Sequence, residues 1–174
     1  MKIINTILFV NILSVMVMLL VSCSDEASQE KIETLRIDQI WNDQIPANSV
    51  DEINDPQGCY KDKEAMSYLL IPDSVAQEQN ITVKLYGCWD NGLYIRGSCE
   101  KFQGFKTREE DNVVYLQILK RVTNNSPCRS DAMIDILSLK AEYNITNHYK
   151  SGDIIEFLIQ NPDGTTLRHR LTIH

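Results

Sequence analysis

Three side chains of the types used by serine hydrolases lie close together near the C-terminus. His148, Ser151 and Asp153 could supply a base, a nucleophile and an orienting carboxylate. They flank Gly152, however, and small polar residues around a glycine are typical of a turn before a strand. The chain also lacks a Gly-x-Ser-x-Gly elbow, a His-Glu-x-x-His pair and a phosphate-binding loop. We therefore interpret this segment as a turn and predict that the protein is not an enzyme.

Potential metal ligands occur in two other places, and neither has the spacing of a known site. His169 and His174 are five positions apart on a predicted strand, so their side chains should face opposite ways. A loop with several oxygen ligands lacks the Asp-x-Asp-x-Asp-Gly order of a calcium loop; it contains Asp51, Glu52, Asn54 and Asp55. The acidic run 109–111 is interpreted as the polar lead-in to a strand. We predict no metal site and no cofactor.

One aromatic cluster has the composition of a recognition surface. Tyr86, Trp89 and Tyr94 lie close in sequence, with Asp90 and Asn91 between them. Aromatic rings beside amide and carboxylate groups can hold sugar rings or the side chains of a partner. The alternative is that these rings stabilise a hairpin, or that Trp89 closes the end of the core. The sequence leaves both open.

Four cysteines besides Cys23 are candidates for disulfides: Cys59, Cys88, Cys99 and Cys128. In an oxidising compartment, four cysteines predict two disulfides with three possible connectivities. No pair has the Cys-x-x-Cys spacing of a zinc or thioredoxin-like site.

The elements that would position these residues have the period-two pattern of strands. Residues 81–86 alternate apolar and polar, and residues 93–98 do the same after Asp90-Asn91-Gly92. This pattern predicts a hairpin. A three-residue loop would place Val83 opposite Cys99 and put all the apolar residues on one face, whereas a two-residue turn would not. In that register Cys88 and Cys99 face opposite ways and lie too far apart to bond, so each should pair with Cys59 or Cys128.

Further strands are predicted at Val113–Val122, Met133–Lys140, Ile154–Gln160 and Leu167–Ile173. The last two flank Asn161-Pro162-Asp163-Gly164, which is typical of a type I turn. Residues 35–72 contain short apolar pieces whose structure the periodicity does not decide. No long helix-period stretch follows residue 22. The pattern predicts an all-β protein, an antiparallel immunoglobulin-like β-sandwich.

The N-terminus has the features of a secretory signal. Lys2 precedes an apolar run over residues 7–21, and the small residue Ser22 lies just before Cys23. Acidic residues follow, whereas a membrane-spanning anchor usually has basic residues after it. The tetrapeptide Leu20-Val21-Ser22-Cys23 resembles the bacterial lipobox. This resemblance implies that Cys23 is lipidated and becomes the first residue of the mature chain.

The residues around this site extend the resemblance. Ser24 after the cysteine resembles an outer-membrane sorting signal, and Asp25-Glu26 resembles the surface-export signal of Bacteroidetes-type lipoproteins. Asp73-Ser74-Val75 resembles the O-glycosylation acceptor of that group, which implies modification at Ser74. Residues 81–174 also resemble small sandwich domains of secreted bacterial lipoproteins, through the Asn-Gly hairpin, Pro127-Cys128 and Gly152-Asp153. That likeness implies a fold and no function.

We therefore expect a signal peptide at 1–22, a lipidated flexible tether at 23–34 and a single domain at 35–174. Without Lys2 the mature chain has 16 Lys and Arg against 24 Asp and Glu, a net charge of −8, which argues against a nucleic-acid partner. We expect an outer-membrane, lipid-anchored protein, exposed at the cell surface or facing the periplasm. It would be a binding or accessory module for a glycan, a peptide or an envelope protein. The alternatives are a structural or assembly lipoprotein of an envelope complex and, third, an unrecognised enzyme.

Overall fold

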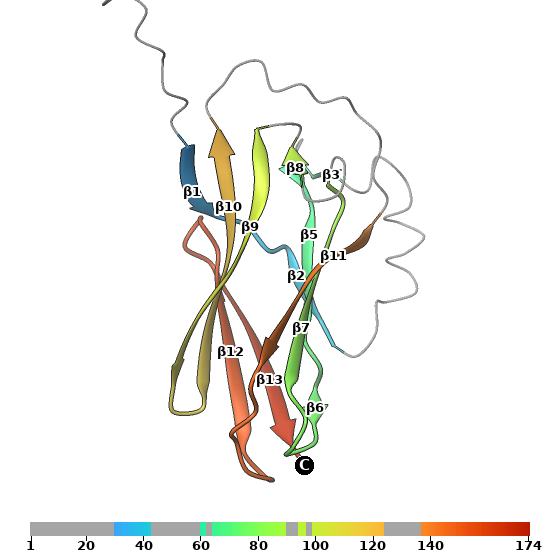
Figure 1. Cartoon of the computed structure of the whole chain (residues 1–174), viewed down its shortest axis with the longest axis vertical. Helices are drawn as coiled ribbons and strands as arrows, with labels where there is room; N and C mark the ends of the chain where they lie inside the picture. The colour runs from blue at the N-terminus through green and yellow to red at the C-terminus, as the bar shows by residue number, and fades with distance from the viewer. Residues whose placement is uncertain (1–29, 43–59, 62–63, 90–93, 97–98, 124–136) are drawn as a thin grey trace, which may run out of the picture.

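A computed structural model describes residues 30–42, 60–61, 64–89, 94–96, 99–123 and 137–174 (Figure 1). These residues form strands and no helix, so the predicted all-β class is confirmed for them. The strands are β1 (Glu30–Thr34), β2 (Gln39–Trp41), β3 (Tyr60–Lys61), β4 (Glu64–Ala65), β5 (Ser67–Leu70), β6 (Ser74–Val75), β7 (Ile81–Gly87), β8 (Tyr94–Arg96), β9 (Glu100–Glu110), β10 (Val113–Thr123), β11 (Ser138–Ile145), β12 (Ile154–Gln160) and β13 (Thr166–Ile173). Accordingly, the described residues contain no helix that could span a membrane.

Two main sheets form the layers of the fold. The first is 7-stranded, in the order β6-β13-β12-β10-β9-β8 with β1 also paired to β10; the second is 4-stranded, in the order β11-β7-β5-β2. The two-residue strands β3 and β4 pair separately. Three of the pairings are parallel, β10 with β12, β13 with β6 and β2 with β5, so the expectation of purely antiparallel sheets was wrong. Parallel strands need a crossover, and the chain between β10 and β12 supplies it by way of β11 in the other sheet.

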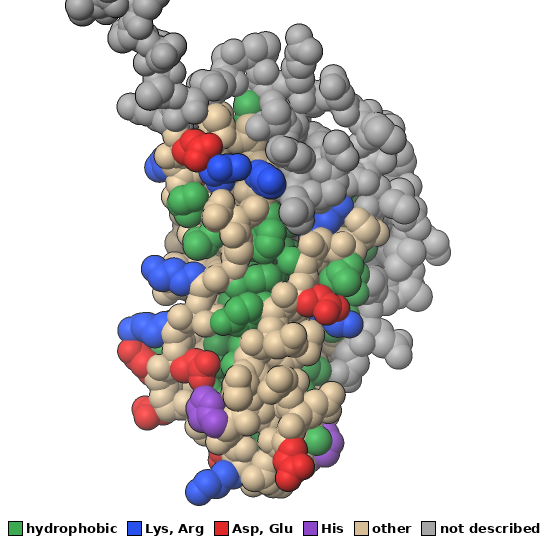
Figure 2. All heavy atoms as spheres, viewed as in Figure 1, with side chains coloured by type: hydrophobic (Ala, Val, Ile, Leu, Met, Phe, Trp, Pro, Cys, Tyr) green, Lys and Arg blue, Asp and Glu red, His purple; other side chains and the backbone are tan. Residues whose placement is uncertain are grey.

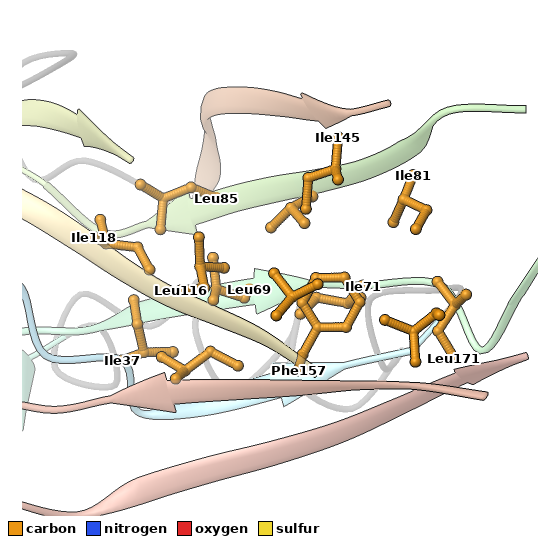
Figure 3. Close-up of a cluster of buried hydrophobic side chains, with 14 of the residues drawn as sticks. Ile37, Leu69, Ile71, Ile81, Leu85, Leu116, Ile118, Ile145, Phe157 and Leu171 are labelled. Carbon is orange, nitrogen blue, oxygen red and sulfur yellow. The ribbon is translucent and has the colours of Figure 1, made fainter. Parts of the chain in front are cut away.

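The core lies between the two sheets and is built from the alternating apolar positions of their strands. In β7 the residues Ile81, Val83 and Leu85 are fully buried, as their period-two spacing predicts. In β10 the inward positions are Val114, Leu116 and Ile118. Figure 3 shows these side chains meeting residues of β5 and β12, including Leu69 and Phe157. Burying each large side chain contributes about 1.5–3 kcal/mol, so this interior dominates the stability of the fold.

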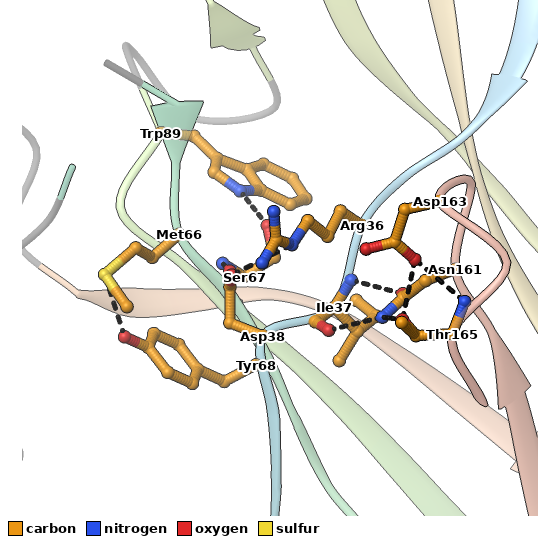
Figure 4. Close-up of polar contacts among 10 residues, drawn as sticks. All are labelled: Arg36, Ile37, Asp38, Met66, Ser67, Tyr68, Trp89, Asn161, Asp163 and Thr165. Carbon is orange, nitrogen blue, oxygen red and sulfur yellow. Dashed lines mark hydrogen bonds and ion pairs between the residues drawn. The ribbon is translucent and has the colours of Figure 1, made fainter. Parts of the chain in front are cut away.

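The hairpin of β12 and β13 has the predicted turn and the predicted boundaries, except that β13 begins one residue earlier, at Thr166. The N–H of Gly164 donates to the carbonyl of Asn161 at 3.1 Å, and Gly164 has a φ of 85°, which a glycine adopts without strain. The buried Asn161 side chain also binds the chain between β1 and β2. Its Oδ1 accepts the Ile37 N–H at 2.8 Å, and its Nδ2 donates to the Ile37 carbonyl at 2.9 Å (Figure 4). One amide thus ties the N-terminal segment to the C-terminal hairpin.

The predicted hairpin of residues 81–97 does not form. Both edges of β7 are occupied, by β11 and by β5, and Val83 lies opposite Tyr143 rather than Cys99. The strand β8 belongs to the other sheet and pairs with β9. Alternation correctly predicted which residues of β7 point inward, but it carries no information about the partner strand.

Besides the short strands β2 to β6, which the sequence left undecided or did not indicate, the strands β1 and β9 were not predicted. Residues 30–34, expected to belong to the tether, form β1 and pair antiparallel with β10 from Glu30 opposite Thr123 to Thr34 opposite Leu119. The long strand β9 was missed entirely, and the acidic residues 109–110 lie at its end. Asp111, with a φ of 52°, lies in the turn to β10. The strand predicted at Met133–Lys140 is found at β11, Ser138–Ile145, and residues 133–136 lie outside the described residues.

The sandwich is closed on one side by aromatic side chains between β9 and β11. Phe105 stacks on Tyr143 with ring centroids 5.3 Å apart, and the Tyr143 hydroxyl lies 3.1 Å from Thr107 Oγ1. Phe102 contacts Phe105 edge-on at 5.4 Å. These rings are partly buried against the core, and Figure 2 shows hydrophobic side chains running down the middle of this side.

Candidate binding face

The candidate triad residues have structural roles in a turn. The Asp153 carboxylate accepts the Lys150 backbone N–H at 2.9 Å, and His148 is an exposed residue whose Nε2 lies 3.7 Å from the Glu109 carboxylate. The Asp153 carboxylate is therefore engaged with backbone, while His148 is oriented toward β9. This agrees with the interpretation of residues 148–153 as a turn.

The two candidate histidine ligands do not come together: His169 lies on the inward face of β13, and His174 follows the end of that strand. His169 is buried, and its Nε2 lies 3.0 Å from the Pro72 carbonyl oxygen, whereas His174 is exposed. Among the residues that the structure describes, no three His, Cys, Asp or Glu side chains gather closely enough to hold a metal ion. The acidic loop at 51–55 lies outside the described residues.

Trp89, the central residue of the predicted aromatic surface, is fully buried in the core. Its Nε1 donates to Ser67 Oγ at 3.0 Å, and its ring lies 5.9 Å from the Phe102 ring between centroids (Figure 4). A Cβ on Gly87 would overlap the Trp89 ring, so the glycine provides the space for the indole. Trp89 therefore closes the core, which is one of the two alternatives that the sequence left open, and the alternative of an exposed binding surface is wrong for this residue.

The other members of the predicted surface are dispersed. Tyr86 lies on the outward face of the four-stranded sheet, 6.2 Å from Trp41 between ring centroids, and Trp41 stacks on Tyr68 at 4.3 Å. The backbone of Tyr94 pairs with that of Lys101. Asp90 and Asn91 lie outside the described residues. The structure therefore does not bring Tyr86 and Trp89 together on one exposed surface.

Cys88 and Cys99 are both buried and both disulfide-bonded. Cys59 and Cys128 lie outside the described residues, so the connectivity stays a prediction. The argument that excluded a bond between Cys88 and Cys99 used a hairpin that does not form. A different observation now supports the same exclusion: Cys88 packs with Trp41 and Tyr68 on the outward face of the four-stranded sheet, whereas Cys99 precedes β9 in the other sheet.

Ser74 occupies a position suited to modification. It is an exposed residue in the two-residue strand β6 at the edge of the seven-stranded sheet, opposite Thr172. Its neighbour Val75 is buried. The Ser74 hydroxyl is thus accessible on a well-anchored segment, while glycosylation itself stays a prediction.

A row of side chains across the outward face of the seven-stranded sheet was not predicted. Arg108 on β9 lies opposite Tyr115 on β10, and Tyr115 lies opposite Leu158 on β12. Leu158 in turn lies opposite Arg168 on β13. Directly opposite residues point to the same face, so this row has an arginine at each end and apolar surface between them.

A second row runs beside the first. Lys106 lies opposite Gln117, and the Gln117 side chain donates to the Gln160 side chain at 3.4 Å. The two rows border a shallow hollow of about 270 Å³; it is lined by Lys106, Thr107, Arg108, Tyr115, Leu116, Gln117 and Gln160. Cations, amides and one phenol therefore surround an open hollow. The rest of the first row, Leu158 and Arg168, adjoins this hollow without lining it. We call the hollow and this adjoining part of the first row together the sheet groove.

The charged groups on this face carry a local excess of positive charge. In the first row and the rows on either side of it, this face presents four cations and two carboxylates: Lys106, Arg108, Arg168, Arg170, Glu110 and Glu156. The chain as a whole has a net charge of −7. In Figure 2, Lys and Arg side chains lie along the left margin, where Figure 1 places β9 and β10, together with several Asp and Glu side chains.

The arginines of the first row are held in place by neighbours. The Arg108 guanidinium binds Glu110 at 2.6 Å and lies over the Tyr115 ring, 4.2 Å from its centroid. Arg168 lies 3.6 Å from Glu156. Within the described part of the chain, Lys106 makes no ion pair. The groove therefore combines oriented guanidinium groups with an ammonium group that has no carboxylate neighbour there.

Sequence reasoning missed this face because its residues come from four separate strands. The signal was present in the alternation of Lys106 and Arg108, and of Arg168 and Arg170, with inward-facing neighbours. Only the strand order shows that these cations share a face. Comparison with protein-family models, with curated proteins and with solved structures found no match to this chain.

Proposed function

We propose that this protein is a lipid-anchored surface lipoprotein whose immunoglobulin-like sandwich acts as a non-catalytic binding module. The signal peptide and lipobox-like sequence supply the anchor at Cys23. The binding surface is the outward face of the seven-stranded sheet rather than the aromatic cluster around Trp89.

The observation that carries this proposal is the sheet groove itself. It is an open hollow on a rigid sheet, and its polar groups, from Lys106, Arg108, Gln117 and Gln160, converge on one volume of about 270 Å³. Ligand sites commonly combine a concave surface with a few convergent polar groups. Because the backbone of each strand is paired, a ligand would meet a surface that is already organised.

The anchor can be tested by localisation. Cys23→Ala should release the protein from membrane fractions or leave it unprocessed, because the lipid contributes the membrane affinity. Retention of a normally cleaved Cys23→Ala protein in the membrane would contradict the lipoprotein assignment. Protease treatment of intact cells would then distinguish a surface location from a periplasmic one.

The binding surface can be tested by filling the groove. We propose Gln160→Trp in the detergent-solubilised full-length protein, applied to an array of neutral and acidic glycans. The bulky ring should block binding of any ligand in the groove, whatever its charge. Gln77→Trp adds the same ring at another exposed glutamine, outside the groove, and should leave binding unchanged. Array binding that is equal in both variants, or absent from the wild-type protein, would contradict a binding function for this groove.

A further inference from the structure

We propose that the sheet groove recognises an acidic polysaccharide, laid across the strands. This inference rests on the proposed binding function and specifies its ligand. It follows from the order of side chains in the two rows and from the charge of this face relative to the rest of the chain.

The ends of the first row provide binding sites for carboxylates. Arg108 and Arg168 terminate this row on β9 and β13, and Lys106 lies beside Arg108 in the second row. Guanidinium groups bind carboxylates with two parallel hydrogen bonds, and one acidic neighbour leaves several N–H donors unused. The Tyr115 ring and Glu110 orient the Arg108 guanidinium before a ligand arrives.

The centre of the groove suits a sugar ring. The Tyr115 phenol and the Leu158 side chain lie between the two arginines, and both are partly exposed. Leu158 offers apolar surface for the C–H groups of a pyranose, whereas the Tyr115 ring carries the Arg108 guanidinium on its face. The amides of Gln117 and Gln160 lie in the neighbouring row and can donate to and accept from hydroxyl groups.

The dimensions favour a polymer over a small anion. Arg108 and Arg168 are separated by three strand spacings, which amounts to about 14 Å for adjacent strands about 4.8 Å apart. A single phosphate or acetate ion cannot span that distance. An extended chain that carries a negative charge on successive sugars can contact both ends and the centre together.

The same residues disfavour nucleic acid. Single-stranded nucleic acids bind through aromatic rings whose faces accept bases. Here the Arg108 guanidinium lies over the Tyr115 ring.

The test measures binding of the full-length protein in detergent to polygalacturonate, alginate and chondroitin sulfate, with dextran as the neutral control. The double variant Lys106→Gln/Arg168→Gln removes one charge from each end of the groove. We expect at least one acidic polymer to bind with an affinity that falls with added salt, and to bind the double variant about tenfold or more weakly. The matched control Lys84→Gln/Lys150→Gln removes one half-buried and one exposed cation elsewhere and should bind as wild type.

Several results would overturn the inference. They are binding of dextran alone, equal binding by the two double variants, no binding of any of the three acidic polymers, and charge-dependent binding that occurs only to single-stranded DNA or to phosphatidylglycerol vesicles. The experiments also distinguish failure of the acidic specificity from failure of the proposed binding function of the groove. If Gln160→Trp abolishes binding of a neutral glycan and the charge variants do not affect it, the groove is a binding site and the acidic specificity is wrong. If Gln160→Trp affects no binding, the groove itself is not the site.

Discussion

The Trp89 indole fixes one end of the core through contacts with three elements. Its ring packs on Phe102 of β9, its N–H binds Ser67 of β5, and it occupies the space that a side chain at Gly87, at the end of β7, would need. A buried indole stabilises a fold by removing a large apolar area from water, and a hydrogen bond from its N–H fixes the orientation of the ring. These contacts thus indicate that Trp89 stabilises the fold rather than binding a partner.

The first prediction concerns Gly87. Gly87→Ala should lower the free energy of unfolding by about 1–3 kcal/mol, because the added methyl group overlaps the Trp89 ring. Denaturant titration measures this loss. In a Trp89→Leu background the same substitution should cost much less, since the ring that it overlaps is gone. An equal cost in both backgrounds would show that the indole is not the cause.

The second prediction concerns Tyr149. Burial, and then the charge of Glu109 and the hydrogen bond from the tyrosine hydroxyl to it, raise the pKa of Tyr149 from 10.0 to about 12. Between these pH values the folded chain keeps a proton that the unfolded chain loses, so the free energy of unfolding should fall as pH rises through this window. Tyr149→Phe should make that fall shallower in denaturant titrations from pH 9 to 12. An unchanged slope would contradict this assignment.

At the level of single residues, the sequence predicted some positions correctly and left others undecided. It predicted the inward positions of β7 and that His169 and His174 would not come together, because both depend only on the period of two. It left the role of Trp89 open, because an aromatic residue next to a turn signal can close a core or form a surface. Burial depends on what packs above the residue, and here Phe102 comes from a strand that was not predicted.

Among the elements, the hairpin of β12 and β13 was predictable because its turn chemistry is local. The strand β9 was not, because it contains an irregularity. The pairing of β9 with β10 shifts between Leu119 opposite Gly104 and Lys120 opposite Phe102, so Phe102 and Phe105 are three residues apart although both pack toward the core. A bulge of this kind breaks the alternation that a strand prediction uses.

The third prediction concerns β1. Amides of residues 30–34 should exchange with deuterium more slowly than those of an unstructured tether, because these residues pair with β10. Hydrogen exchange with mass spectrometry measures this directly. The peptides that cover residues 119–123 of β10 serve as the internal comparison. Exchange of residues 30–34 at unstructured rates would support the original tether boundary at residue 34.

At the scale of the whole molecule, the charge pattern distinguishes one face from the rest. The net charge of the chain does not determine the charge of any one face, because four cations on one face are compatible with a negative net charge for the whole chain. Such a face could not be predicted from the sequence, since its rows combine residues up to about 60 positions apart, such as Arg108 and Arg168. Only the parallel pairing of β10 with β12 places them on one surface.

The fourth prediction is that the mature domain has two disulfides and that Cys88 and Cys99 are not bonded to each other. Each bridge should contribute about 2–4 kcal/mol, mainly by restricting the unfolded chain. Peptide mapping without reduction identifies the pairs. A peptide that links Cys88 to Cys99 would mean that Cys88 does not belong to the outward cluster with Trp41 and Tyr68.

The shared edge of β10 has a consequence for proteolysis and self-association. One edge of this strand is divided between β12, along residues 113–116, and β1, along residues 119–123. A protease cut just after Thr34 would separate β1 from the rest of the chain. Residues 119–123 of β10 would then lose the strand that pairs with them. Unpaired strand edges accept strands from other molecules. The N-terminal strand of an intact copy could occupy the vacancy, so trimming would favour association of trimmed with intact molecules by donation of β1.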